Sequence, residues 1–105
     1  PQLADVLHER LGREPMVIGD QTVSSVAWCT GAGQGFIGAA ADWGADAFVT
    51  GEVSEQTVHI ARERDIGFIA AGHHATERYG VKAVGERVAE ALDLSHEFID
   101  VANPA

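Results

Sequence analysis

Two adjacent histidines followed by a glutamate form the pattern in this chain most suited to chemistry. They lie in the segment Gly72-His73-His74-Ala75-Thr76-Glu77, directly after an apolar, strand-like stretch. If a helix begins here, His73 and Glu77 are four residues apart and project from one face. An imidazole nitrogen and a carboxylate oxygen that converge in this way suit a divalent transition metal. The segment therefore predicts half of a metal site, because such a site normally needs four or more ligands.

The same pair also has a simpler interpretation. A histidine and a glutamate at this spacing often form an ordinary contact on a helix surface, which stabilises the helix by about 0.2–0.5 kcal/mol. A helix N-terminus also carries partial positive charge, which opposes a cation unless carboxylates offset it. The spacing alone leaves both interpretations open.

Glu52 and His74 are the candidate catalytic residues beside this pair. Glu52 follows a short apolar stretch, Ala47–Thr50, and could act as a metal ligand, as a partner that orients His73 or His74, or as a general base. Its alternative role is that of an acidic residue near a helix start, stabilised by the helix dipole. His74 is a candidate for proton transfer or for a supporting contact to the metal ligands.

A glycine-rich turn offers a different function. The segment Gly33-Gln34-Gly35-Phe36-Ile37-Gly38 matches G-x-G-x-x-G between an expected strand and helix, and Glu52 follows about twenty residues later. In a dinucleotide site, the turn would hold the pyrophosphate and Glu52 a ribose hydroxyl. Any tight turn from strand to helix also needs glycine, so the motif is compatible with a purely structural role.

Composition excludes several classes of protein. The net charge is −9, from sixteen acidic and seven basic residues, which repels nucleic-acid phosphates and favours cations. No apolar run approaches the roughly 20 residues that span a bilayer, and no signal peptide is recognisable. The single cysteine, Cys29, cannot form an internal disulfide, which indicates a cytoplasmic protein. Because the chain begins with Pro1, we expect a fragment or a protein whose first part is missing.

Helical and strand-like patterns alternate along the chain. Strands are predicted at Val26–Cys29, Ala47–Thr50, 68–71 and 96–101. Helices are predicted at Gln2–Leu11, from the glycine-rich turn to about Trp43, from a Ser54 N-cap to about Asp65, and from the two histidines to about Leu92, with a possible break near Gly80.

This alternation predicts one α/β domain over residues 1–105, with βαβ units and a mostly parallel sheet covered by helices on both faces. In such sheets, the loops at the carboxyl ends of the strands carry the ligands. Loops 30–35, 51–55 and 72–77 should therefore lie at one edge of the sheet.

Four segments taken together resemble the C-terminal part of the YbgI-like family, whose members are often named GTP cyclohydrolase 1 type 2 homologs. They are residues 26–31 (VAWCTG), 46–57 (DAFVTGEVSEQT), 71–78 (AGHHATER) and 98–105 (FIDVANPA). The resemblance implies a cytoplasmic, ring-shaped hexamer with a centre of two divalent transition metal ions in each subunit. The C-terminal ligand pair of the family corresponds to His73 and Glu77.

The resemblance also implies that the site is incomplete in this chain. Family members are more than twice as long, and their remaining ligands, a histidine pair and an aspartate, come from an N-terminal half that nothing here matches. The implied function is that of a metal-dependent hydrolase acting on a nucleotide or a similar small molecule, to which this chain supplies the C-terminal ligands.

Two alternatives remain at this point. One is a nucleotide- or dinucleotide-binding module that uses Gly33, Gly35, Gly38 and Glu52. The resemblance makes this alternative less favourable, because it explains the glycine-rich turn as a feature of a family without such a cofactor. The other is a non-catalytic role in assembly or regulation.

Overall fold

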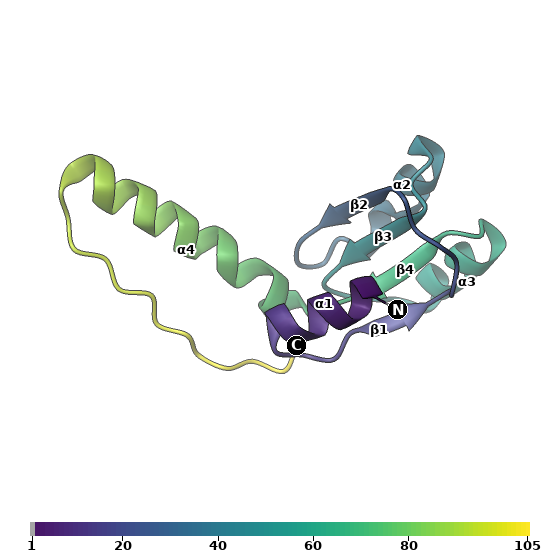
Figure 1. Cartoon of the computed structure of the whole chain (residues 1–105), viewed down its shortest axis with the longest axis horizontal. Coiled ribbons are helices and arrows are strands. Elements are labelled where there is room, and N and C mark those ends of the chain that lie inside the picture. The colour runs from purple at the N-terminus through teal and green to yellow at the C-terminus, as the bar shows by residue number, and fades with distance from the viewer. Residues whose placement is uncertain (1) are drawn as a thin grey trace.

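A computed structural model describes residues 2–105 as a small α/β fold with one projecting helix (Figure 1). In chain order the elements are α1 (Gln2–Leu11), β1 (Met16–Ile18), β2 (Val26–Cys29), the short 3-10 helix η1 (Gln34–Phe36), α2 (Ile37–Trp43), β3 (Ala47–Thr50), α3 (Glu55–Glu63), β4 (Gly67–Ala70) and α4 (His73–Leu92). None of the helices in residues 2–105 is long and apolar enough to cross a membrane.

The four strands form one sheet in the order β1-β4-β3-β2. Strands β2, β3 and β4 are parallel, with Trp28 opposite Val49 and Val49 opposite Ile69. Strand β1 pairs with β4 in the antiparallel direction. The predicted mostly parallel sheet is confirmed, and the antiparallel strand β1 is an addition to it.

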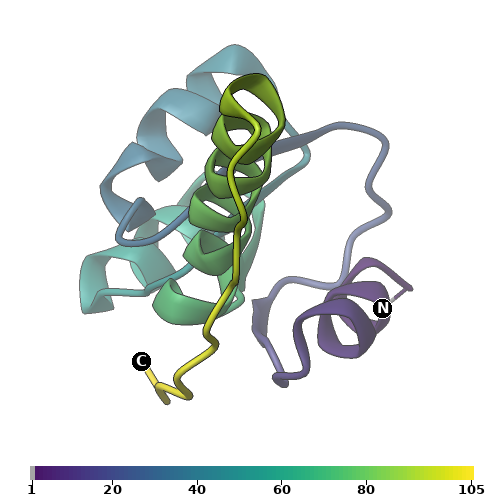
Figure 2. The same cartoon turned by 90° about the vertical axis from the view of Figure 1, so that its left-hand side faces the viewer.

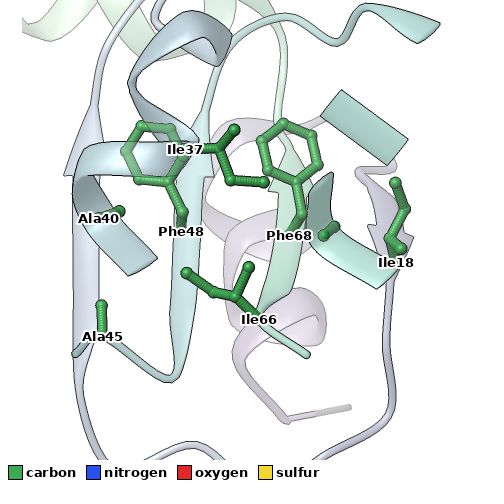
Figure 3. Packing of buried hydrophobic residues seen from close by; sticks show 8 residues of the cluster. Ile18, Ile37, Ala40, Ala45, Phe48, Ile66 and Phe68 are labelled. Atoms are coloured by element: carbon green, nitrogen blue, oxygen red, sulfur yellow. The ribbon is translucent and has the colours of Figure 1, made fainter. Parts of the chain in front are cut away.

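Helices cover both faces of the sheet, as predicted. On one face, α2 and α3 bury a cluster around Phe48 and Phe68, whose ring centroids lie 6.2 Å apart (Figure 3). On the other face, Leu3, Leu7 and Leu11 of α1 pack against Val49 and Ile69. Full burial of a side chain such as Phe68 stabilises the fold by about 1.5–3 kcal/mol, so these two layers hold the strand ends in fixed positions.

The ends of α2 and α3 agree with the sequence. Helix α2 ends at Gly44, whose φ of 88° places it in the left-handed region that glycine adopts without strain. Helix α3 follows Ser54, whose backbone N–H donates a hydrogen bond to Thr57 Oγ1 at 3.1 Å. Both boundaries fix the positions of the loops that precede and follow β3.

The last part of the chain differs from its prediction in two ways. Gly80 does not break α4, which is continuous from His73 to Leu92, because a single helical glycine costs only about 1 kcal/mol. Residues 96–101 form no strand, so this prediction was wrong. They run back alongside α4 instead, away from either edge of the sheet, where no strand offers backbone partners (Figures 1 and 2).

Candidate metal centre

The three predicted loops meet at the carboxyl ends of β2, β3 and β4. The N–H of Gly51 donates to the carbonyl of Gly31 at 2.9 Å, and the N–H of Gly72 donates to the carbonyl of Gly51 at 3.0 Å. The N–H of Gly31 donates to Thr76 Oγ1 in the first turns of α4 at 3.0 Å. These bonds confirm that loops 30–35, 51–55 and 72–77 share one edge of the sheet.

The backbone segments approach so closely at this edge of the sheet that position 51 must be glycine. A Cβ atom at position 51 would lie 2.7 Å from the Cα of His73 and 2.9 Å from the carbonyl oxygen of Gly72. Any side chain here would push α4 away from the end of β3. The glycine therefore allows Glu52, which follows it, to reach the first residue of α4.

His73 lies between two carboxylates, one on each ring nitrogen. Its Nδ1 atom is hydrogen-bonded to Glu52 Oε1, and its Nε2 atom lies 3.0 Å from Glu77 Oε2. The three side chains are partly exposed, so a ligand can reach them from solvent. The structure thus brings together His73, Glu77 and Glu52.

These contacts raise the pKa of His73 above the ordinary histidine value. The hydrogen bond from His73 to Glu52 is the main cause; burial acts in the opposite direction, and the charges of Glu77 and Glu52 add to the increase. In the absence of a metal, the imidazolium form can donate to both carboxylates. The ring is therefore held in place by charge as well as by hydrogen bonds.

The donor set fits a cation at Nε2. When Nδ1–H donates to Glu52, the neutral ring turns its Nε2 lone pair towards the Glu77 carboxylate, and two electron-rich atoms 3.0 Å apart need a proton or a metal ion between them. Ligand atoms bonded at about 2.1 Å to one metal lie about 3.0–3.4 Å apart, which agrees with this spacing. Glu52 then corresponds to the carboxylate that commonly accepts the other N–H of a metal-bound histidine.

The pair alone does not complete a site. Within residues 2–105, no group of three or more histidine, cysteine, aspartate or glutamate side chains is placed to surround one metal ion. Glu52 and Glu77 contact opposite nitrogens of the ring, which explains why the three residues do not form such a group. That His73 and Glu77 form part of a metal site stays a prediction.

His74 faces a different partner. Its Nε2 atom lies 3.4 Å from Asp100 Oδ1, and Asp100 also accepts a hydrogen bond from Arg78 at 3.3 Å. The backbone N–H of His74 donates to the carbonyl of Ala105 at 3.1 Å. In the described part of the chain, His74 forms no hydrogen bond or ion pair with Glu52 or Glu77, so the structure places it with the C-terminal segment.

Polar groups of the glycine-rich turn already form hydrogen bonds within the protein. The N–H of Gly33 donates to Thr50 Oγ1 at 3.1 Å, and the side chain of Gln34 donates to Ser54 Oγ at 3.2 Å. The turn leads into a 3-10 helix before α2, and Gly35 and Gly38 lie in these two helices. These bonds join the turn after β2 to the end of β3 and to Ser54. The Glu52 carboxylate is hydrogen-bonded to His73.

Comparisons with known proteins agree with the resemblance found in the sequence. The model of the Duf34/NIF3 (NGG1p interacting factor 3) family matches residues 1–104. The chain is 58% identical to a protein of Yersinia pestis and 56% identical to one of Escherichia coli strain K12, both named "GTP cyclohydrolase 1 type 2 homolog". These matches cover 98% and 99% of this chain, and 43% of each relative.

Solved structures give the same result. The structure described as "protein ybgI, unknown function" is 56% identical, with a TM-score of 0.91. The protein TTHA1606 from Thermus thermophilus is 34% identical, with a TM-score of 0.89. Each match covers 99% of this chain and 43% of the other, so the chain spans less than half the length of these relatives. The chain belongs to the Duf34/NIF3 family.

Proposed function

We propose that this chain supplies His73 and Glu77 to a centre of two divalent transition metal ions in a metal-dependent hydrolase. The substrate would be a nucleotide or a similar small molecule, in line with the names of the relatives. The observation that carries the proposal is the 3.0 Å contact between His73 Nε2 and Glu77 Oε2, with Glu52 on the opposite nitrogen of the ring. This arrangement presents two metal-binding atoms on one side of the ring and fixes its orientation from the other.

Each residue has a separate task in this proposal. Glu52 accepts a hydrogen bond from Nδ1–H and so keeps the Nε2 lone pair available to the metal. Glu77 adds negative charge beside that lone pair, one helical turn further along α4. Bound divalent metals would supply Lewis acidity and an activated water. His74 is available for proton transfer only if it leaves Asp100, since Asp100 holds its Nε2 atom.

The rest of the centre would come from outside these 105 residues. The relatives are more than twice as long as the matched region. The family resemblance implies that the other ligands come from their N-terminal half. The same resemblance supports a cytoplasmic, ring-shaped homo-oligomer, a hexamer. Without those further ligands, we expect the pair to hold metal weakly.

Elemental analysis of protein purified without chelator tests the proposal. We expect bound transition metal in the full-length protein, which would carry the further ligands, and its loss in His73→Ala/Glu77→Ala. A matched control exists on α3, where His59 and Glu55 form another pair four residues apart, at 3.9 Å and strongly exposed. The His59→Ala/Glu55→Ala variant should keep its metal. Equal metal content in both variants would contradict the assignment.

A further inference from the structure

Arg13 reaches the start of α4 from the loop between α1 and β1. A Cβ atom at Gly72 would lie 2.7 Å from Arg13 Nη1 and 2.9 Å from its Cδ. Gly72 has a φ of 104°, a conformation that other residues rarely adopt. The glycine that precedes His73 therefore also makes room for the guanidinium.

The guanidinium has no partner in residues 2–105. Arg64 and Arg78 form ion pairs with Asp42 and Asp100, whereas Arg13 forms no ion pair or side-chain hydrogen bond in this part of the chain. Its Nη1 atom is buried and has no acceptor. A buried donor without a partner costs about 1–3 kcal/mol, and such an atom in a native protein calls for an explanation, such as a bound water or ion. Glu14 and Glu52 line the same pocket as Arg13, and within residues 2–105 neither forms an ion pair with it.

Arg13 also lines a pocket of about 330 Å³ next to the candidate metal centre. The pocket lies between the α1–β1 loop, the ends of β3 and β4, and the last residue, and its lining includes Glu14, Gly51, Glu52 and Ala105. Glu52 is the carboxylate that holds His73. Among the described residues that line this pocket, Arg13 is the basic one.

We propose that Arg13 binds an oxyanion, the phosphate group of a phosphorylated substrate, beside His73 and Glu52. A guanidinium offers a planar pair of N–H donors that matches two oxygens of a phosphate. The net charge of −9 repels such a group, and so do the carboxylates of Glu14 and Glu52 in the pocket, so Arg13 would decide where an anionic substrate can be held. This inference rests on the proposed function for its substrate class, and it concerns a residue that does not bind the metal.

The test measures oxyanion binding without metal, so that it is independent of the metal centre. Isothermal titration calorimetry of chelator-treated protein would use inorganic phosphate, a nucleoside monophosphate and the matching nucleoside. We expect both phosphate-containing probes to bind the parent protein and the nucleoside to bind at least tenfold more weakly. In Arg13→Gln, the affinity for both phosphate-containing probes should fall at least tenfold. Arg87→Gln removes the same charge from an exposed position on α4 and should change neither affinity.

Arginine side-chain NMR covers the case in which Arg13→Gln does not fold. Phosphate added to the parent protein should shift the Nε–H signal of Arg13, identified by its loss in Arg13→Lys. No binding to the parent, an unshifted signal, or equal weakening in Arg87→Gln would overturn the inference. Metal content is measured in parallel. If protein purified without chelator holds no metal and phosphate binding still depends on Arg13, the inference is supported and the proposed function is contradicted. If that protein holds metal and phosphate binding does not depend on Arg13, the proposed function is supported and the inference is contradicted.

Discussion

The Nδ1 atom of His73 is hydrogen-bonded to Glu52, and this bond joins the end of β3 to the first residue of α4. Glu52 lies in the loop after β3 and His73 begins α4, and the two residues meet because Gly51 lets the two backbones approach. One carboxylate thereby sets the orientation, the tautomer and the proton affinity of the histidine that is proposed to bind metal.

Replacing Glu52 with glutamine should weaken metal binding without removing a ligand. Loss of the carboxylate behind a metal-bound histidine typically lowers metal affinity by about 10–100-fold, because the ring is less basic and less well oriented. The measurement is a competition titration against a metal-binding dye at alkaline pH, where protons compete little for His73. Glu55→Gln, an exposed change on the next helix, is the control. An unchanged affinity in Glu52→Gln would show that the His73–Glu52 bond has no part in the site.

The stability of the metal-free protein should depend on pH through His73. The contacts with Glu52 and Glu77 raise its pKa in the folded state above the ordinary value of about 6.5. The native state therefore binds this proton more tightly than the unfolded state does. The resulting stabilisation is fully present below about pH 6.5 and is lost as the pH rises through the raised pKa of the folded protein.

Thermal unfolding of chelator-treated protein from about pH 6 to pH 9 checks this sign. The melting temperature of the parent should decrease relative to that of Glu52→Gln as the pH rises, because Glu52 is the main cause of the raised pKa. Parallel curves for the two proteins across this range would contradict the assignment.

Substitution by alanine should lower the stability of the fold strongly at Phe68 and weakly at Phe36. Phe68 is fully buried against Phe48, so Phe68→Ala should lower the free energy of unfolding by about 3–5 kcal/mol through lost burial and the cavity left behind. Phe36 is 62% exposed, and Phe36→Ala should cost far less. Urea denaturation of the two variants measures both effects, and comparable losses would mean that the packing in Figure 3 is incorrect.

Local patterns in the sequence predict most of the elements, because each follows a short-range rule. The leucines of α1 recur at helical spacing, and glycines mark the ends of α1 and α2. No such rule predicts strand β1, since its three residues are too few to show a period. The alternation of residues 96–101 suggested a strand, but a strand also needs a neighbour with free backbone groups, and the sequence does not reveal where this segment runs.

The contacts of the candidate site also include some that the sequence predicts and others that only the structure gives. The spacing of His73 and Glu77 is local and predicts their contact, and the parallel order of strands predicts that Glu52 lies at the same edge. The atom that Glu52 contacts depends on how closely two loops approach, which only the structure gives. Arg13 lies far from both in sequence, and no spacing rule connects it to Gly72. His74 was predicted as a candidate for proton transfer or for a supporting contact to the metal ligands, but its partner Asp100 depends on the path of the C-terminal segment.

Two glycines of α4 provide a matched test of where the C-terminal segment lies relative to this helix. Gly80 has open space where a Cβ would be, so Gly80→Ala should raise the free energy of unfolding by up to about 1 kcal/mol through helix propensity. A Cβ at Gly85 would overlap the imidazole of His96. Gly85→Ala should therefore raise the free energy of unfolding by less than Gly80→Ala, because the C-terminal segment must move away from α4. In a His96→Ala background, Gly85→Ala should recover the full gain, and urea denaturation of the four proteins in this cycle measures the coupling. Equal gains at Gly80 and Gly85 in the parent would mean that His96 does not rest on α4.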